Sequence, residues 1–405
     1  MKAAIINTVI GTGSVGRIAC GTADELLSHG DEVLLCRGRG DAVPGYDSYR
    51  IGSDLDMYAH GVLSRITDRH GLYSRGATKE LIKRLEEYKP DIIQLHNVHG
   101  YYLNYPMLFE WLKGYGCPVV WTLHDCWSFT GHCVHYEYRS CEKWKDASCG
   151  SCPESREYPA SYICDNSSSN LRKKRECFTG IPDLHIVTPS VWLRSQVGMS
   201  MLSAYPVEVI NTGIDLDAFR HTDSDIRDSY GIGDRVLILG VANPWRERKG
   251  MFDMAKLAMR LDPEKYVFAM IGLKKGQMNL LPPHIIKKGH TDSVQSLAEW
   301  YSAADIYVNL TYEDTLPTAN IEALACGTPV VTYRAGGSPE TVDKAEDDGV
   351  RIGLVTEKND IQAVISSIEY FGHKKPEVSK ACRTQARRFD KKDKFREYYE
   401  LYQKI

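Results

Sequence analysis

Short apolar runs alternate with longer amphipathic stretches along the whole chain. Continuous apolar runs are typical of strands buried on both faces of a parallel sheet, and the stretches between them fit the helices that connect such strands. The clearest runs are Ala3–Asn7, Val33–Cys36, Asp91–Leu95, Pro118–Leu123, His185–Thr188, Val236–Val241, Tyr266–Gly272, Ala304–Asn309 and Pro329–Tyr333. The pattern predicts an α/β protein with two doubly wound parallel units.

The boundary between these units is expected within Pro206–Phe219, where a short strand pattern is followed by a glycine-containing turn. This predicts an N-terminal domain over residues 1–207 and a C-terminal domain over 208–385. In the last segment, residues 386–405, aromatic side chains recur at helical spacing among many charges, at Phe395, Tyr398, Tyr399 and Tyr402. That segment is predicted to be an amphipathic helix packed on another part of the chain.

Length, composition and charge describe an ordinary globular protein. The chain has 405 residues, of which 43% are hydrophobic and 25% charged, and its formal net charge is −3. Such a balance does not favour nucleic-acid binding. No apolar run approaches the roughly 18 residues that span a bilayer, and polar residues and glycines interrupt the first 23 residues. We therefore expect a cytoplasmic protein, and no basic amphipathic helix stands out as a membrane anchor.

A glycine-rich loop, Gly11–Gly16, follows the first predicted strand and opens a helix, with Gly13 and Ser14 as candidate ligand contacts. The loop alone fits a ligand-binding loop, a tight structural turn or a dinucleotide site. A dinucleotide site needs an acidic residue about 20 positions further on. Cys36-Arg-Gly-Arg-Gly40 stands there instead, which counts against that interpretation.

Basic residues gather after the strand Val236–Val241, at Arg246, Arg248 and Lys249. Ligands bind at the carboxyl edge of a parallel sheet, where this loop is predicted to lie. Fixed cations there would neutralise a diphosphate and stabilise it as a leaving group without a metal ion. A solvated basic loop is the alternative.

Two acidic residues, Asp314 and Glu322, flank the start of a helix predicted after Pro317. The N–H groups of its first turn, including those of Thr318 and Ala319, would face an anion. Glu322 is placed to accept hydrogen bonds from vicinal hydroxyls, and Asp314 to contact a second polar group. A nucleotide sugar supplies both partners, whereas an ordinary turn with a capping Asp and a solvated Glu is the alternative.

Four of the twelve cysteines, Cys133, Cys141, Cys149 and Cys152, fall within twenty residues and end in Cys-x-x-Cys. This spacing predicts a structural zinc site that pins the segment 126–164, with His132, His135 and Cys126 as substitute ligands. Unligated thiols and a redox or iron–sulfur role are the alternatives. Disulfides are disfavoured because we expect a cytoplasmic protein without an export signal.

Together these motifs resemble the retaining glycosyltransferases of family 4, which have the GT-B fold. The resemblance runs through the whole chain in order: Gly11–Gly16, His124-Asp125, Asn211–Asp215, Arg248-Lys249-Gly250, Asp314 with Glu322, and Gly336-Gly337. It implies two Rossmann-like domains facing across a cleft. The first would bind the acceptor, the second would bind the nucleotide sugar, and the final helix would cross back to the first domain.

The resemblance also implies roles for single residues. Asp314 and Glu322 match the family's acid pair, so Asp314 would meet the donor sugar and Glu322 the ribose. His124 would hydrogen-bond the donor sugar, and His96 and His99 would contact the acceptor. The chain departs from the family in three ways. Asp314 replaces a glutamate, for which its neighbour Glu313 could substitute. Pro317 stands where many members have glycine. Asn243 and Pro244 stand where the family has an arginine, whose part would fall to Arg246 or Arg248.

The expected function is transfer of a sugar from a UDP- or GDP-linked donor to a glycan or lipid-linked acceptor, with retention and without a catalytic metal. The cysteine-rich loop resembles one in a colanic-acid-type branch linked to bacterial exopolysaccharide synthesis. A lipid-linked acceptor would bring the chain into peripheral contact with the inner membrane. Two alternatives stay open: a nucleotide-sugar epimerase of the same fold, and a non-catalytic scaffold that binds nucleotide sugars.

Overall fold

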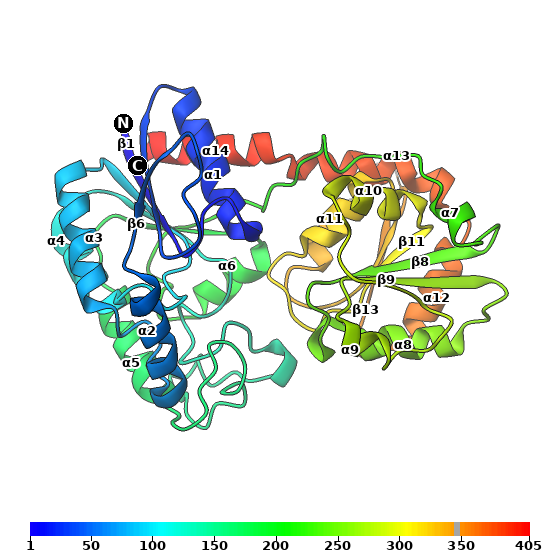
Figure 1. Cartoon of the computed structure of the whole chain (residues 1–405), viewed down its shortest axis with the longest axis horizontal. Coiled ribbons are helices and arrows are strands. Elements are labelled where there is room, and N and C mark those ends of the chain that lie inside the picture. The colour runs from blue at the N-terminus through cyan, green and yellow to red at the C-terminus, as the bar shows by residue number, and fades with distance from the viewer. Residues whose placement is uncertain (344–348) are drawn as a thin grey trace. The chain divides into compact units, whose positions relative to one another are not determined.

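The computed structural model describes residues 1–343 and 349–405, which form two compact units (Figure 1). Unit 1 comprises Met1–Asn211 and Lys392–Ile405, and unit 2 comprises Thr212–Lys391. The division falls within Pro206–Phe219, a few residues beyond the predicted boundary at residue 207. The C-terminal segment joins unit 1.

Unit 1 is built on a seven-stranded parallel sheet in the order β3-β2-β1-β4-β5-β6-β7. The order reverses between β1 and β4, so the loops after these two strands diverge and leave a crevice at the carboxyl edge. The strands are β1 (Lys2–Asn7), β2 (Glu32–Arg37), β3 (Asp47–Arg50), β4 (Ile92–Leu95), β5 (Val119–Thr122), β6 (Leu184–Thr188) and β7 (Val207–Val209).

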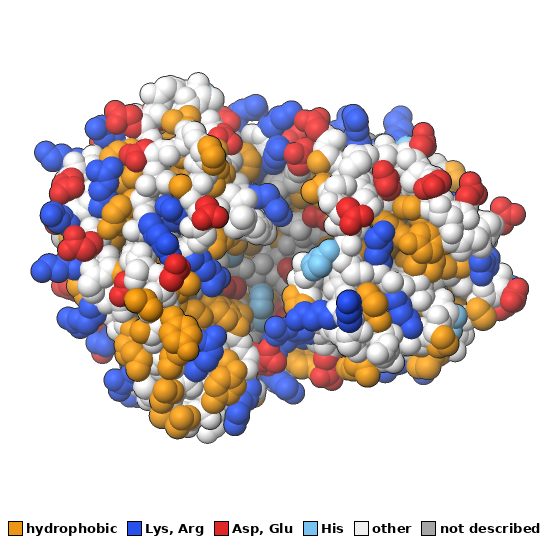
Figure 2. Space-filling view, viewed as in Figure 1, with side chains coloured by type: hydrophobic (Ala, Val, Ile, Leu, Met, Phe, Trp, Pro, Cys, Tyr) orange, Lys and Arg blue, Asp and Glu red, His pale blue; other side chains and the backbone are white. Residues whose placement is uncertain are grey.

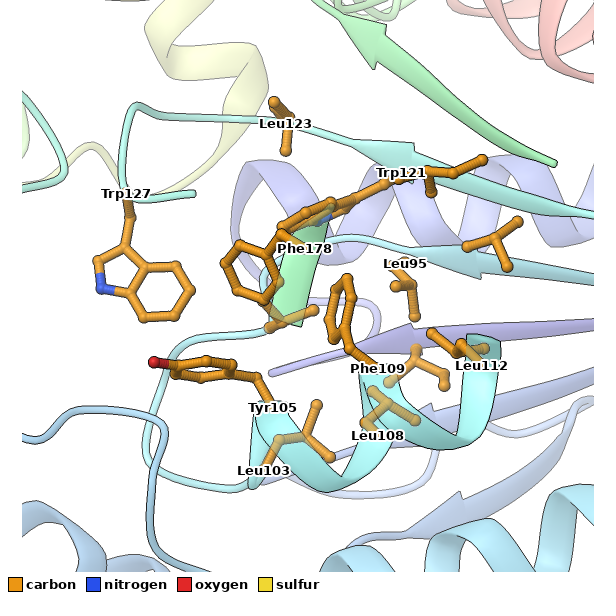
Figure 3. Close-up of a cluster of buried hydrophobic side chains, with 14 of the residues drawn as sticks. Leu95, Leu103, Tyr105, Leu108, Phe109, Leu112, Trp121, Leu123, Trp127 and Phe178 are labelled. Atoms are coloured by element: carbon orange, nitrogen blue, oxygen red, sulfur yellow. The ribbon is translucent and has the colours of Figure 1, made fainter. Parts of the chain in front are cut away.

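Helices cover both faces of this sheet. They are α1 (Gly13–Ser28), α2 (Asp54–Thr67), α3 (Arg75–Tyr88), α4 (Tyr105–Tyr115), α5 (Ser167–Phe178), α6 (Val191–Gly198) and α14 (Lys391–Lys404). On one face, α3, α4, α5 and α6 bury a large aromatic and aliphatic cluster. Figure 3 shows Phe109 of α4, Trp121 of β5 and Phe178 of α5 meeting there. Their ring centroids are 4.5–5.1 Å apart.

The opposite face is covered by α1 and α14. Tyr398, Leu401 and Tyr402 of α14 pack with β1 and β5, as the aromatic spacing predicted. A Cβ atom at Gly21 of α1 would lie 2.1 Å from the ring of Phe395, so only glycine permits this close approach. The C-terminal helix therefore completes the core of unit 1.

Unit 2 repeats the architecture with a six-stranded parallel sheet in the order β10-β9-β8-β11-β12-β13. The order reverses between β8 and β11. The strands are β8 (Val236–Val241), β9 (Tyr266–Ile271), β10 (Ile286–Lys288), β11 (Ile306–Asn309), β12 (Val330–Tyr333) and β13 (Gly353–Thr356). The helices are α7 (Ile226–Ser229), α8 (Met251–Arg260), α9 (Lys275–Met278), α10 (Val294–Ala303), α11 (Thr318–Ala325), α12 (Ile361–Phe371) and α13 (Lys375–Ala386). α8 and α12 pack on one face, and α10, α11 and α13 on the other.

All nine predicted strands are present, with ends shifted by at most two residues. The prediction omitted β3, β10 and β13, which are short strands at sheet edges. Their sequences, DSYR, IKK and GLVT, lack the continuous apolar run of a strand buried on both faces.

Candidate functional site

In unit 2 the loops after β8 and β11 meet at the point where the strand order reverses. The Tyr312 N–H donates to the Arg248 carbonyl at 2.9 Å. Gly250 adopts φ +75°, and a Cβ atom there would lie 2.3 Å from the Leu310 carbonyl oxygen. The glycine after Arg248-Lys249 therefore lets the two loops touch where ligands of such sheets bind.

Lys249 and Asp314 come together at this junction, as members of the two loops. Lys249 Nζ lies 2.8 Å from Asp314 Oδ2, and the two side chains are 33% and 24% exposed. Lys249 Nζ is also 3.5 Å from the Glu313 carbonyl oxygen. A predicted phosphate-binding cation and a predicted sugar-binding acid thus form one partly open charged pair.

Glu313 is buried beside Arg248 and is not placed to substitute for Asp314. Arg248 Nη1 lies 2.5 Å from Glu313 Oε1, and the Glu313 side chain is only 1% exposed. This ion pair fixes the two loops to each other, because a buried carboxylate needs a charged partner. Arg246 is exposed at the start of the 3₁₀ turn Glu247–Lys249, and so is the more accessible of the two predicted arginines.

Glu322 lies one turn into α11 and is oriented by a buried tyrosine of α10. The Tyr301 hydroxyl donates to Glu322 Oε2 at 3.0 Å. Burial, and next the charge of Glu322, raise the pKa of Tyr301 well above its ordinary value, so the phenol stays a donor. Pro317 caps α11, and Thr318 and Ala319 form its half-buried first turn. The predicted helix start is therefore present beside Asp314.

The loop after β12 supports Asp314 through its backbone. The Gly337 N–H donates to the Asp314 carbonyl at 3.1 Å. Gly336 adopts φ +49°, and a Cβ atom there would lie 1.7 Å from the same carbonyl oxygen. The Gly336-Gly337 pair thus sets the position of Asp314.

Asp253 in the first turn of α8 was not predicted as a site residue. It accepts hydrogen bonds from Tyr312 at 2.6 Å and Tyr333 at 3.1 Å, and it pairs with Lys256 at 2.7 Å. These contacts anchor the loop that carries Asp314. Asp253 gave no sequence signal because it lies inside an ordinary amphipathic helix pattern.

In unit 1, His96 after β4 and His124 after β5 stack at the carboxyl edge of the sheet. His96 Nδ1 lies 2.9 Å from His124 Nε2, and the rings are 5.2 Å apart. Burial lowers the pKa of His124 to about 4 and the pKa of His96 well below its ordinary value. Both rings are therefore neutral near pH 7, where one donates a hydrogen bond to the other.

His99 joins the same pocket, which residues 96–99, 121–125, 127 and 128 line. His99 Nε2 lies 2.9 Å from Asp125 Oδ2, and His99 Nδ1 lies 3.1 Å from the Tyr158 hydroxyl. Burial alone would raise the pKa of Asp125, but His99 holds it below the ordinary value. Asp125 is thus an ionised acceptor beside His99, in the pocket that also holds the neutral His96 and His124, a role that the sequence did not assign to it.

The glycine-rich loop lies at the reversal point of unit 1. Thr8 Oγ1, just after β1, donates to the His99 carbonyl at 2.7 Å. Gly13 and Ser14 are exposed in the first turn of α1. These two predicted donor contacts therefore belong to unit 1, whereas Lys249, Asp314 and Glu322 belong to unit 2.

A buried lysine of α5 holds the segment that follows Asp125. Lys174 Nζ donates to the Trp127 and Thr130 carbonyls at 2.6 and 2.9 Å and lies 3.5 Å above the Trp127 ring. Burial lowers the pKa of Lys174 to about 7. Lys174 was not predicted as a site residue because a lysine on a helix normally faces solvent.

Cys133, Cys141, Cys149 and Cys152 line a single pocket together with His132. The Cys133 and Cys152 thiols form a hydrogen bond. His132 Nδ1 pairs with Asp68, and His132 Nε2 is buried with no hydrogen-bond partner among the residues described. Within residues 1–343 and 349–405, no three His, Cys, Asp or Glu side chains are arranged to hold a metal ion. Zinc binding therefore stays a prediction.

Among the helices that the structure describes, none combines the length and apolar character needed to cross a membrane.

Two family models match the chain. The model of Glycosyltransferase Family 4 matches residues 15–218, and the model of Glycosyl transferases group 1 matches residues 223–389. Together they take in the histidine pocket of unit 1 and the charged junction of unit 2.

Similar curated proteins include a putative colanic acid biosynthesis glycosyl transferase, WcaC of Escherichia coli K12. It is 26% identical over 304 residues, which cover 72% of this chain and 69% of WcaC. D-inositol 3-phosphate glycosyltransferase 2 of Catenulispora acidiphila is 34% identical over 150 residues, or 32% of this chain. The match spans only 35% of that relative's length.

Solved structures share the whole fold at low sequence identity. Sucrose-phosphate synthase from Thermosynechococcus elongatus superposes with a TM-score of 0.70 at 14% identity, covering 100% of this chain and 98% of the synthase. Anabaena Alr3699/HepE in complex with UDP gives 0.67 at 15% identity, covering all of both chains. The chain has the GT-B fold, with two Rossmann-like parallel sheets.

Proposed function

Because the chain belongs to glycosyltransferase family 4, we propose that it transfers a sugar from a nucleotide-sugar donor to a glycan or lipid-linked acceptor, with retention at the anomeric carbon. The observation that carries this proposal is the junction in unit 2. There Lys249 and Asp314 form a partly exposed pair at the reversal point of the sheet, beside the start of α11 and Glu322. A diphosphate and a sugar need such neighbouring positive and hydrogen-bonding groups.

The donor would lie along the carboxyl edge of the unit 2 sheet. Lys249 and Arg246 would neutralise the diphosphate, with the N–H groups of Thr318 and Ala319 at its other side. Glu322, oriented by Tyr301, would accept hydrogen bonds from the ribose hydroxyls. Asp314 would contact the transferred sugar. HepE was crystallised with UDP, which favours a UDP-linked donor over a GDP-linked one.

Transfer would depend on the departure of the diphosphate. As the bond between the sugar and the phosphate breaks, negative charge develops on the leaving oxygen, and fixed cations and N–H groups stabilise that charge most in the transition state. On the acceptor side, unit 1 offers His124 for the donor sugar, His96 and His99 for the acceptor, and the Asp125 carboxylate as a hydroxyl partner. Gly13 and Ser14 are exposed and stay candidate contacts for the donor.

The similarity to WcaC supports a place in bacterial surface-polysaccharide synthesis. The relatives described above are glycosyltransferases, so they favour neither the epimerase nor the non-catalytic scaffold.

A panel of UDP- and GDP-sugars tests the function directly. One donor should raise the melting temperature and be consumed when a glycan or lipid-linked acceptor is added, because a ligand that binds only the folded state stabilises it. Glu322→Ala should lose most of both effects while keeping its circular dichroism spectrum. Consumption of the donor by Glu322→Ala at the normal rate would contradict the proposed site.

We also propose that Cys133, Cys141, Cys149 and Cys152 bind a structural zinc ion. Their convergence on one pocket, with the unpartnered His132 Nε2 beside them, supports this. Protein purified without chelators should contain about one zinc per chain, as a closed four-ligand site requires. Cys149→Ser should lower the zinc content and the melting temperature. Protein that contains no zinc would end this proposal.

A further inference from the structure

α2 has its apolar and polar sides reversed relative to the other helices of unit 1. Its buried residues are His60, Gly61 and Ser64. Its exposed large side chains are apolar, and they are Leu55 (80% exposed), Tyr58 (73%), Ile66 (41%), Leu63 (40%) and Val62 (37%). Positions 55, 58, 62 and 66 share one helix face. A surface helix normally turns that kind of face inward.

The neighbouring segment Tyr162-Ile163 extends this surface. The Tyr162 N–H donates to the Arg65 carbonyl at 2.8 Å, and the Cys164 N–H donates to the Ile66 carbonyl at 3.1 Å. Tyr162 and Ile163 are 54% and 74% exposed. Figure 2 shows orange side chains gathered at the lower left, where α2 lies in Figure 1, with blue Lys and Arg side chains around them. We call these seven residues the α2 apolar face.

The helix is fixed in this orientation by the contacts of His60 on its inner side. An exposed capping box of Ser53 and Asp56 forms its start. His60 Nδ1 lies 2.7 Å from the Ser74 hydroxyl, and the Gly71 N–H donates to His60 Nε2 at 3.1 Å. Turning the apolar face inward would break these hydrogen bonds of His60. The exposure is therefore a property of the folded unit.

Apolar faces of this extent mark interaction sites, and the side chains here favour a lipid surface. Two tyrosines, Tyr58 and Tyr162, belong to the face, and tyrosine is enriched at the boundary between acyl chains and head groups. Arg156 lies above the Tyr162 ring, 5.7 Å from its centroid, and Arg65 and Arg69 follow on the helix and just beyond it. Of the acidic residues at the helix start, Asp54 pairs with Arg50, whereas Asp56 accepts hydrogen bonds from Ser53 and keeps its charge. Basic residues beside an apolar face attract anionic lipids.

The inner side of α2 leads to the candidate acceptor pocket of unit 1. The His60 and His70 rings are 6.2 Å apart, and the His70 and His99 rings are 6.0 Å apart. Tyr158, which hydrogen-bonds His99, lies four residues before Tyr162 in the same segment. The buried side of α2, opposite its apolar face, is thus connected through the His60 and His70 rings to the pocket that holds His99 and Asp125.

We propose that the α2 apolar face docks unit 1 on an anionic lipid membrane, so that a lipid-linked acceptor reaches the His99 pocket from the bilayer. The docking step stands on the exposed residues alone, whereas the delivery of an acceptor rests on the proposed function.

Vesicle binding by the full chain tests the docking step. Vesicles of phosphatidylglycerol and phosphatidylethanolamine should bind the protein, and vesicles of phosphatidylcholine should bind it more weakly. The triple variant Leu55→Ser, Tyr58→Ser and Ile163→Ser should bind anionic vesicles with an affinity about tenfold lower than that of the wild type, since membrane affinity scales with buried apolar area. Met259→Ser, at a 65% exposed position of α8 in unit 2, is the matched control and should bind normally.

Melting temperature and UDP binding confirm that the triple variant is folded, because none of its three positions belongs to the donor site. Equal vesicle binding by the triple variant and the wild type would overturn the proposal, as would a wild type that ignores vesicles. A dimer that dissociates in the triple variant would assign the face to a second copy of the chain. Vesicle binding without sugar transfer would refute the proposed function and leave the docking surface standing.

Discussion

The two units share one topology but place different chemistry at the point where the strand order reverses. In unit 1 that point holds the buried, neutral imidazoles of His96 and His124, with the ionised Asp125 in the same pocket. In unit 2 it holds a partly exposed charged pair, Lys249 and Asp314, beside a helix start. The fold provides the crevice in both units, and the loop residues decide what can bind there. Neutral donors and acceptors suit an uncharged hydroxyl-rich ligand, whereas fixed charges suit a diphosphate.

The largest expected effect is at the charged junction. Lys249→Ala removes the cation placed for the leaving diphosphate, so sugar transfer should fall about 10²- to 10³-fold, as when one preorganised group is removed from a transition-state site. The loss should appear in kcat as well as in donor affinity. Steady-state kinetics with the identified donor measure both.

Lys380→Ala is the control for this change, since Lys380 is exposed on α13 of the same unit. It should leave kinetics unchanged. If Lys249→Ala kept a normal kcat, the charge of the unit 2 crevice would not be needed for sugar transfer.

The second prediction concerns the neutral histidines of unit 1. Burial lowers the pKa of His124 from 6.5 to about 4 in the folded chain. Between these values the unfolded chain binds a proton that the folded chain does not, so this contribution to stability is complete above pH 6.5 and is lost as pH falls toward 4. The loss amounts to about 3 kcal/mol.

Urea unfolding at pH 7 and pH 4.5 measures this loss. His124→Gln should show a smaller drop in the free energy of unfolding than the wild type. His221→Gln changes an exposed histidine of unit 2 and should reproduce the wild-type drop. An unchanged drop in His124→Gln would mean that His124 is not held neutral by burial.

Most of the fold was readable from the sequence because a strand buried on both faces must be apolar throughout. The edge strands β3, β10 and β13 were not predicted, because they lack such a run; Ile286–Lys288, for example, has two lysines in three residues. α2 was not recognised as a surface feature because periodicity reveals an apolar face but not the side to which it turns. Only the contacts of His60 and Ser74 fix that side.

The sequence predicted which loops form the candidate site, but it did not predict which side chains contact each other there. The sequence placed Lys249 and Asp314 at the carboxyl edge, and the structure brings them within 2.8 Å. It could not show that Glu313 is the buried partner of Arg248, because adjacent residues alternate between inside and outside according to the loop conformation. Asp253 and Tyr301 were missed for a similar reason, since they contact the site only through the packing of α8 and α10.

A third, smaller effect is expected at the glycine that supports Asp314. Gly336→Ala places a Cβ atom 1.7 Å from the Asp314 carbonyl oxygen at φ +49°, so the loop must shift, at a cost of about 1–3 kcal/mol in stability. Donor affinity should fall with it, while the histidine pocket of unit 1 stays intact. Gly276→Ala in α9 meets no atom within 4 Å and is the control. Normal donor binding by Gly336→Ala would show that the position of Asp314 is not critical.

The smallest effect separates the two roles of Glu322, orientation by the protein and contact with the ligand. Tyr301→Phe removes only the hydroxyl that donates to Glu322 Oε2. One hydrogen bond contributes about 1 kcal/mol, which corresponds to a roughly fivefold increase in KM for the donor, with kcat nearly unchanged. Tyr307→Phe is the matched control, because the Tyr307 hydroxyl in the same unit donates to the Val241 carbonyl and not to a carboxylate. An equal rise in KM for both variants would assign the effect to general packing of the unit 2 core. A rise in Tyr301→Phe alone would show that the charged crevice depends on a neutral buried donor behind it, as the crevice of unit 1 depends on its imidazoles.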